Sequence, residues 1–428
     1  MHYKSLSVAA AGALLMSAAT SSQAASWEAG DWTLSMSGQV NVHAAMTSCE
    51  SASSAVSVDA GLACAQATSS TDQDNFSVQN GLLPASFVFG ASTVQNGWDL
   101  HAQLGLYPGI ATNDTLGGGG PNLRGGGAGQ NTGLGSTGLD VRQVFLKFGK
   151  DEVGTFKLGR DYGIFGFDAI INDMTIQGMG PIHGSVGAPA NTTLGSIGVG
   201  YLYTDTLAQV NYTTPNFSGF TATVGVFEPL DTFSLADITA SNAQGTISSS
   251  TTGQLVETPG YHGRVKYRYG AEMVEGFVSA SFIQQDMPAV GNNGSESTGY
   301  DVTATLNVAD LSLLGSYYAG EGLGTTALFF DGFDGQGDKR DSDGFLAQAT
   351  YAFGDTKLGV NYGVSNLDQT DNDPDTLLDK HEKYTVGVYH NMTDNLLLVG
   401  EYSDFTAENH NGNDNSSSNY SVGAVLSF

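Results

Sequence analysis

Four basic side chains recur at every second position of one short segment, residues 261–269. They are His262, Arg264, Lys266 and Arg268, and the positions between them hold mainly Tyr261, Val265, Tyr267 and Tyr269. Successive side chains of a strand point to opposite faces, so the cations share one face and the aromatic and apolar residues share the other. A row of cations can attract and orient anions without making or breaking a bond. We predict that this face lines a water-filled passage; the alternative is an ordinary solvated strand.

Covalent chemistry has no comparable set of residues in this chain. The histidines are scattered without an H-x-x-x-H pair, and no Ser or Asp joins one of them in a catalytic constellation. The segment Gly133–Gly138 fits G-x-G-x-x-G, but it lacks the preceding strand and following helix that a dinucleotide site requires. We therefore expect neither an enzyme nor a metal centre.

Two acidic loops carry many carboxylates. Asp371, Asp373, Asp375 and Glu382 have the spacing of a calcium loop, and five aspartates crowd residues 331–343. The sixth position of a calcium loop requires Gly, but here it is Thr376, and Pro374 interrupts the loop. We interpret both loops as solvated surface. Weak Ca²⁺ binding is the alternative, and no other cofactor is expected.

The start of the chain has the pattern of an export signal. Lys4 precedes a short apolar run and the small residues before Ala25. This pattern predicts a Sec signal peptide over residues 1–24 and one mature unit over 25–428. No run approaches twenty apolar residues, so any membrane span must consist of strands. The chain has 43 acidic against 15 basic residues, a net charge of −28, which excludes nucleic acid as a partner.

The two cysteines, Cys49 and Cys64, flank a loop of small residues. An exported protein folds in an oxidising compartment, so we predict that they form a disulfide. Closing a loop of this length stabilises a chain by roughly 3 kcal/mol in the entropic model.

About sixteen segments alternate apolar and polar residues, as Tyr300, Asp301, Val302 and Thr303 do. Short turns such as Asn96-Gly97 alternate with long polar loops at 108–139, 229–258, 286–298, 321–342, 366–381 and 406–418, which is typical of outer-membrane barrels. We predict an all-β, antiparallel transmembrane barrel with a wet, polar interior. Its strands are expected at 32–46, 85–94, 97–107, 141–149, 154–162, 204–213, 219–227, 261–269, 275–285, 299–308, 310–320, 344–353, 356–364, 383–391, 395–405 and 419–428.

One block of sequence is more specific than this pattern. Residues 141–180 read VRQVFLKFGKDEVGTFKLGRDYGIFGFDAIINDMTIQGMG. The block resembles the general-diffusion porins of Gram-negative outer membranes, in which an Arg opens one strand and G-R-x-Y-G leads into the third loop. Residues 210–220, VNYTTPNFSGF, are similar to a hairpin of the same family, and the aromatic last strand matches as well. The resemblance spans the mature chain, and 141–220 is its specific part.

The resemblance implies a homotrimer of 16-stranded barrels, each narrowed by an inward-folded loop. In that family, loop acids face arginines on the barrel wall. Carried over by position, Arg142 and Arg160 are the wall cations, Asp168 lies at the start of the loop, and Asp173 is the loop acid. Gln177 stands where the family often has Glu, which weakens the acidic side of the constriction.

The expected function is passive diffusion of ions and small hydrophilic solutes through the outer membrane, among lipid and lipopolysaccharide. The acidic loops favour cations and the basic strand favours anions, so we predict weak ion selectivity. Two alternatives remain: a substrate-specific channel of similar architecture, for anions or sugars, and a structural or adhesive surface barrel.

Overall fold

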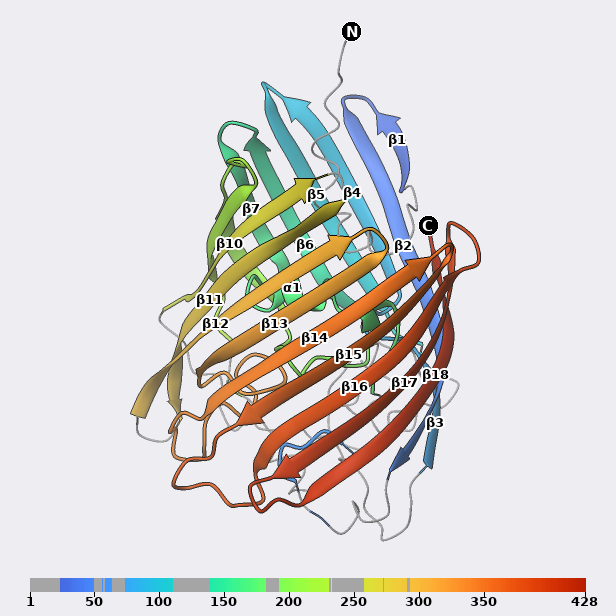
Figure 1. Ribbon diagram of the computed structural model, residues 1–428. Helices are drawn as coiled ribbons and strands as arrows, with labels where there is room; N and C mark the ends of the chain where they lie inside the picture. Colours follow the sequence, from blue (N-terminus) through green and yellow to red (C-terminus); the bar gives the residue numbers. More distant parts are fainter. Residues whose placement is uncertain are drawn as a thin grey trace.

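The structure is a computed structural model that describes residues 24–49, 56, 58–63, 74–110, 139–181, 192–230, 232, 258–271, 273–290 and 293–428. The predicted signal peptide, 1–24, lies outside this part apart from Ala24. One sheet of 18 strands makes up the fold (Figure 1). Within the described ranges, no helix is both long and apolar enough to cross a membrane.

Sixteen of the 18 strands close into a ring. Each pairs antiparallel with the next along the chain, and β18 pairs with β2 to complete the circle. The ring strands are β2 (Trp32–Cys49), β4 (Ser86–Gln95), β5 (Trp98–Pro108), β6 (Leu139–Lys150), β7 (Gly154–Tyr162), β8 (Thr206–Thr213), β9 (Phe220–Phe227), β10 (Gly260–Ala271), β11 (Val274–Val290), β12 (Asn293–Val308), β13 (Leu311–Glu321), β14 (Asp341–Phe353), β15 (Thr356–Leu367), β16 (Leu378–Asn391), β17 (Leu396–Asn409) and β18 (Asp414–Ser427).

The other two strands are short additions to β2. β1 (Ala25–Ala29) pairs with the first residues of β2, and β3 (Asp74–Gln79) pairs with its last residues. Neither was predicted. The predicted barrel of about sixteen strands is confirmed, and each predicted segment corresponds to one ring strand.

Several strands continue beyond their predicted ends. β11 and β12 form a hairpin that reaches Val290 and Asn293, inside a segment predicted as loop. The added residues, such as Asp286 and Glu296, are polar on the outward face as well. Apolar and polar residues alternate only where one face of a strand meets hydrocarbon. Beyond the membrane both faces are polar, so the sequence pattern does not distinguish a hairpin there from a loop.

The two faces of the wall differ as the sequence predicted. On β12, Tyr300 and Val302 are 51% and 40% exposed, whereas Asp301 and Thr303 are 4% and 0% exposed. Apolar side chains therefore cover the outside of the barrel, where a soluble protein would place polar ones. This exterior fits a hydrocarbon solvent.

Aromatic side chains gather in two outward rows. Near the short turns, Phe156 lies between Phe148 and Tyr212, with ring centroids 5.3 and 4.9 Å away. Toward the long loops, Tyr402 lies between Tyr384 and Tyr420, at 5.9 and 4.9 Å. Amphipathic rings at two heights are the girdles expected at the two membrane–water interfaces.

The last residue also closes the ring. The backbone groups of Phe428 exchange hydrogen bonds with those of Gly38 on β2, at 2.8 and 3.0 Å. The Phe428 ring lies 5.6 Å from the ring of Phe87 on β4. The C-terminus is at the same end of the barrel as the short hairpin between β4 and β5 (Figure 1).

The predicted wet, polar interior was wrong for one side of the barrel, which is packed with apolar side chains. Beside β11 to β17, buried apolar clusters join inward residues of the wall to residues from segments 58–63, 165–176, 194–202 and 323–333. For example, Leu328 and Phe329 pack with Ile283 of β11 and Tyr318 of β13. Connecting segments that turn inward carry their apolar residues without a regular period, so strand periodicity could not reveal this packed half.

A charge on the outward face should destabilise the barrel more than the same charge inside. Val302→Lys puts an ammonium in the apolar band and is expected to lower the free energy of unfolding by about 2–4 kcal/mol. Thr155→Lys is the matched control, because Thr155 lies on the inward face of β7 and is exposed. Urea unfolding in lipid vesicles measures both, and an equal loss at the two positions would contradict the assignment of faces.

Candidate functional site: a basic wall and an inward loop

The described parts of the connection between β7 and β8, residues 163–181 and 192–205, lie inside the barrel, as predicted. They contain the short helices α1 (Phe167–Ile170) and η3 (Met174–Gln177), and α1 is visible inside the ring in Figure 1. The backbone N–H of Met174 donates to Gln348 of β14 at 2.6 Å, and that of Met179 donates to Glu401 of β17 at 2.7 Å. These bonds hold the loop against the inner wall.

The basic residues of β10 share one face, as the alternation predicted. His262 and Lys266 are 3% and 7% exposed, whereas Tyr261 and Val265 are 44% and 54% exposed on the outward side. Arg264 and Arg268 have the same parity as His262 and Lys266, and Arg268 is exposed. The four side chains therefore point into the barrel interior.

Asp168 is the loop acid that meets this wall. Its Oδ1 lies 2.6 Å from Lys266 Nζ, and its Oδ2 lies 3.3 Å from Arg264 Nη1. Burial alone would raise the pKa of the Asp168 carboxyl, but the charges of Arg264 and Lys266 outweigh burial and hold that pKa below its usual value. Asp168 is 3% exposed, so its charge is hidden while part of the cationic wall still faces water.

Arg142 points inward because of a β-bulge. Gly105 of β5 pairs with Gln143, but Tyr107 pairs with Asp140, so β6 has one extra residue at this point. The Arg142 guanidinium lies 5.4 Å from the centre of the Tyr107 ring, and its Nε lies 2.7 Å from Asp140. The inward position predicted for Arg142 agrees with the structure, but Asp140 forms an ion pair with its guanidinium.

Arg160 does not face the passage, which corrects the prediction. It pairs across strands with Val144 and Ala208, and Val144 belongs to the outward apolar face. Its guanidinium donates to Val141 O at 3.2 Å and to Thr206 Oγ1 at 2.8 Å. The next residue on β7, Asp161, occupies the inward position because strand parity allows only one of two neighbours to point inward.

Asp173 lies on the loop but is not the acid that faces the basic wall, and this too is a correction. It is 1% exposed and caps η3 by accepting from Thr175 N at 2.9 Å. Tyr201 Oη also donates to it at 2.7 Å. A carboxylate at an N-cap satisfies backbone groups, so the role of Asp173 here is to shape the loop. Gln177 is 8% exposed at the end of η3.

Lys147 and Lys157 also point inward and were not among the predicted site residues. Lys147 of β6 pairs directly with Lys157 of β7. The Lys157 ammonium lies 2.6 Å from Asp161 and 5.7 Å from the centre of the Phe145 ring. The same alternation that identified the β10 cations could have revealed both, since Val144 and Leu146 mark the outward parity of β6.

The acids around the loop are buried and hydrogen-bonded. Asp301 of β12 accepts from Gly166 N at 2.9 Å, and Glu401 accepts from Tyr389 Oη at 2.6 Å. Asp161, Asp301 and Glu401 are 8%, 4% and 6% exposed. By contrast, the side chains of Lys157 and Arg264 are 24% and 21% exposed, whereas the side chains of their partners Asp161 and Asp168 are 11% and 3% exposed. Water beside the loop therefore meets more positive than negative charge.

Two other predictions concern residues outside this wall. Cys49 is buried at the end of β2 and is not a free thiol. Its expected partner, Cys64, lies outside the described residues, so the pairing stays a prediction. Across the described ranges no group of three or more His, Cys, Asp or Glu residues is placed to hold a metal ion. Weak Ca²⁺ binding by the acidic loops stays a prediction without an assembled set of ligands.

Removing the Asp168 charge should raise the preference for anions. In Asp168→Asn, Arg264 and Lys266 lose their partner, so the passage gains one net positive charge. We expect the anion-to-cation permeability ratio to rise about fourfold, because a unit charge roughly 10 Å away in water stabilises an anion by about 0.4 kcal/mol and destabilises a cation by about as much. Reversal potentials in planar bilayers measure the ratio. Asp371→Asn, on an exposed loop, is the control, and an equal change in both variants would refute the role of Asp168.

Solved structures share this architecture at low sequence identity. The outer membrane channel DcaP of Acinetobacter baumannii has a TM-score of 0.62 at 12% identity, over 94% of this chain and 100% of that one. The anion-selective porin from Comamonas acidovorans has a TM-score of 0.59 at 16% identity, over 93% and 100%. OmpF of Salmonella typhi, in complex with daunomycin, has a TM-score of 0.54 at 12% identity, over 94% and 100%. These likenesses establish the fold.

Among curated protein sequences, none matches this chain. A family model, described as Gram-negative porin, matches residues 8–425, which is nearly the whole chain. The closed ring of sixteen strands, the apolar exterior and the inward loop agree with that match. The chain therefore belongs to the Gram-negative porin family and is an outer-membrane channel for the diffusion of solutes.

Proposed function

We propose that the channel passes ions and small hydrophilic solutes passively, with a modest preference for anions and without covalent chemistry. One observation carries the proposal: Lys147, Lys157, Arg264 and Arg268 on the inner wall are at least partly exposed to water, whereas the acids around the loop are buried. The ion pair between Arg264 and Asp168 shows this difference in exposure best, because the Arg264 side chain is 21% exposed and the Asp168 side chain is 3% exposed.

The packed half of the interior strengthens the effect of these cations. The loop and its neighbouring segments occupy the side next to β11 to β17, so the passage must follow the opposite wall. Inward residues on that wall include Lys147, Lys157, Asn211, Thr223 and Arg264, which are all hydrogen-bond donors. Fixed charges along a narrow passage with low-dielectric walls act strongly on ions.

Acids elsewhere limit the preference. Asp99 and Glu275 have inward parity close to the short turns and are not buried. Exposed acids such as Asp371 and Asp375 also lie on a long loop at the other end of the barrel. These charges attract cations to both mouths, so a strong selection between anions and cations is not expected.

A substrate-specific channel for anions is the second candidate. A sugar channel would need bare aromatic faces along the passage, but the inward rings of Phe145 and Tyr389 lie under Lys157 and Lys357, at 5.7 and 4.8 Å. Covered rings cannot stack against a sugar. The positions of these cations therefore favour an anion over a sugar as the preferred solute.

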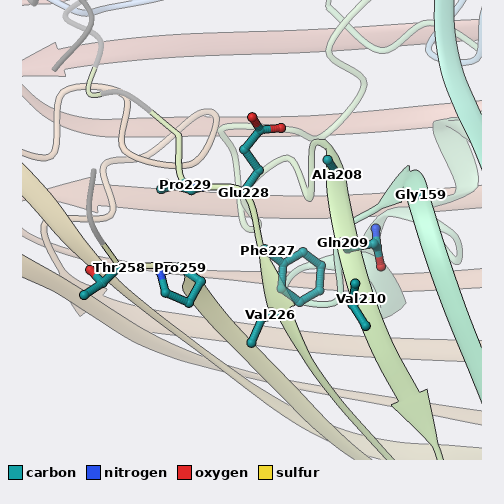
Figure 2. Close-up of a pocket in the computed structure, with 10 residues that line it drawn as sticks. All are labelled: Gly159, Ala208, Gln209, Val210, Val226, Phe227, Glu228, Pro229, Thr258 and Pro259. Carbon is teal, nitrogen blue, oxygen red and sulfur yellow. The ribbon is translucent and has the colours of Figure 1, made fainter. Parts of the chain in front are cut away.

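The outward surface supports a proposal about lipid partners. A pocket of about 490 Å³ lies where β9 ends at the long loop, and Ala208, Val210 and Val226 line it together with Glu228, Pro229 and Thr258 (Figure 2). Its mainly apolar lining fits the end of an acyl chain of a membrane lipid or of lipopolysaccharide.

We further propose that the functional unit is a homotrimer. Tyr420 of β18, Met46 of β2 and Phe76 of β3 form one cross-strand row and are 56%, 48% and 66% exposed. β3 lies outside the closed ring, so its apolar side chains are not needed to complete the barrel. A second copy of the chain would cover this row.

Arg264 and Arg160 make a matched pair for testing the preference for anions. Arg264→Gln should lower the anion-to-cation permeability ratio about fourfold, because it removes an inward charge. Arg160→Gln should leave the ratio unchanged, because Arg160 faces outward. Bilayer reversal potentials measure both variants, and a larger effect at Arg160 than at Arg264 would contradict the assignment of the wall.

The trimer proposal has a separate test. Phe76→Ala should lower the temperature at which trimers dissociate in detergent, whereas Phe282→Ala, an outward aromatic on β11, should have little effect. Unheated and heated gel electrophoresis measures the dissociation. Loss of the folded monomer in Phe76→Ala would show that β3 belongs to the barrel itself.

A further inference from the structure

Several inward cations of the described wall lie over the face of an aromatic ring. Arg264 lies over Phe167 of the loop at 5.8 Å, Lys157 over Phe145 at 5.7 Å, and Lys357 over Tyr389 at 4.8 Å. All these cations lie within the distance at which a ring face attracts a cation. The rings come from different strands and from the loop, so the pattern does not follow from one repeated segment.

Phe277 of β11 is the ring with the most contacts of this kind. The Lys266 ammonium lies 3.7 Å from its centre, which is the shortest of these distances, and the Arg268 guanidinium lies 5.8 Å from it. Arg268 is its direct cross-strand partner. Phe277 has inward parity and is 5% exposed, so the two cations and the wall cover it.

The geometry points to Phe277 as a positioning residue that sets the charge selectivity of the passage. We propose that its ring holds Lys266 and Arg268 in place on the wall and so maintains the positive field beside the loop. The inference rests on the proposed function, because it explains how a preference for anions is built.

The electrostatics of β10 explain why a ring is needed here. Arg264, Lys266 and Arg268 occupy alternate positions of one strand face, so their like charges repel one another. Asp168 bonds to Arg264 and Lys266, but it makes no ion pair with Arg268 in the described structure. The negative face of an aromatic ring attracts a cation without cancelling its charge. A ring can therefore fix these cations and leave the wall positive, which another carboxylate could not do.

A purely structural role for Phe277 makes a different prediction. If the ring only fills space, any apolar side chain of similar volume should serve equally well. Phe277→Leu keeps an apolar side chain but removes the ring, and Phe277→Tyr keeps the ring. Trifluorophenylalanine at position 277 keeps nearly the same shape and weakens only the charge distribution of the ring.

The experiment measures reversal potentials of the wild type and these variants in the same planar bilayers. Phe277→Leu and the trifluorophenylalanine variant should lower the anion-to-cation permeability ratio about two- to fivefold, the equivalent of the ~0.5–1 kcal/mol of an exposed cation–π contact. Phe277→Tyr should keep the wild-type ratio. Phe282→Leu is the control, because Phe282 lies on the same strand and faces outward.

The outcomes separate this inference from the proposed function. A wild type without a preference for anions would refute the proposed function, yet a further shift toward cations in the trifluorophenylalanine variant would still support the role of Phe277. A wild-type ratio in both the leucine and the trifluorophenylalanine variants would overturn the role of Phe277. Should Phe277→Leu fail to fold, the trifluorophenylalanine variant decides alone, because its shape is conserved.

Discussion

Closure of the sheet is the constraint on which the rest of this structure depends. In hydrocarbon, each unpaired backbone N–H or C=O group costs several kcal/mol, so a sheet that crosses a membrane can have no open edge. Here the pairing of β18 with β2, extended by the bonds between Phe428 and Gly38, removes that edge. Once the ring is closed, every strand must place one side chain outward and the next inward. The apolar exterior, the inward cations and the enclosed loop all follow from this division.

The interior shows how a wide barrel becomes a selective one. Sixteen strands enclose more space than their own side chains fill, so connecting segments can fold inside. On one side these segments bury apolar residues against the wall and form a packed core. Along the other side, hydrogen-bond donors and partly exposed cations remain. The acids near the loop do not oppose the cations across open water. Asp168, Asp301 and Glu401 instead hold the loop in place, so they shape the passage while their own charges are hidden.

The fold could be predicted from alternation alone, because the period of two residues is a direct consequence of the solvent on each face. The parity of Arg264 and Lys266 was correct for the same reason. Arg142 marks the limit of this reasoning, since a bulge shifts its parity and only the resemblance to the family placed it inside. The same resemblance was wrong for Arg160. β7 pairs with β6 without a bulge, so Arg160 keeps the outward direction of its partner Val144. The choice between Asp168 and Asp173 depends on the path of an irregular loop, and no periodic signal describes such a path.

Water access to alternate residues of β10 tests the central claim most directly. Single cysteines at positions 265 and 268, in a chain with Cys49→Ser and Cys64→Ser, would be exposed to membrane-impermeant thiol reagents of opposite charge in lipid vesicles. The account predicts that the Arg268→Cys variant reacts, and faster with the anionic reagent, whereas Val265→Cys stays unreactive in hydrocarbon. Equal reaction at both positions, or a faster reaction of Arg268→Cys with the cationic reagent, would contradict it.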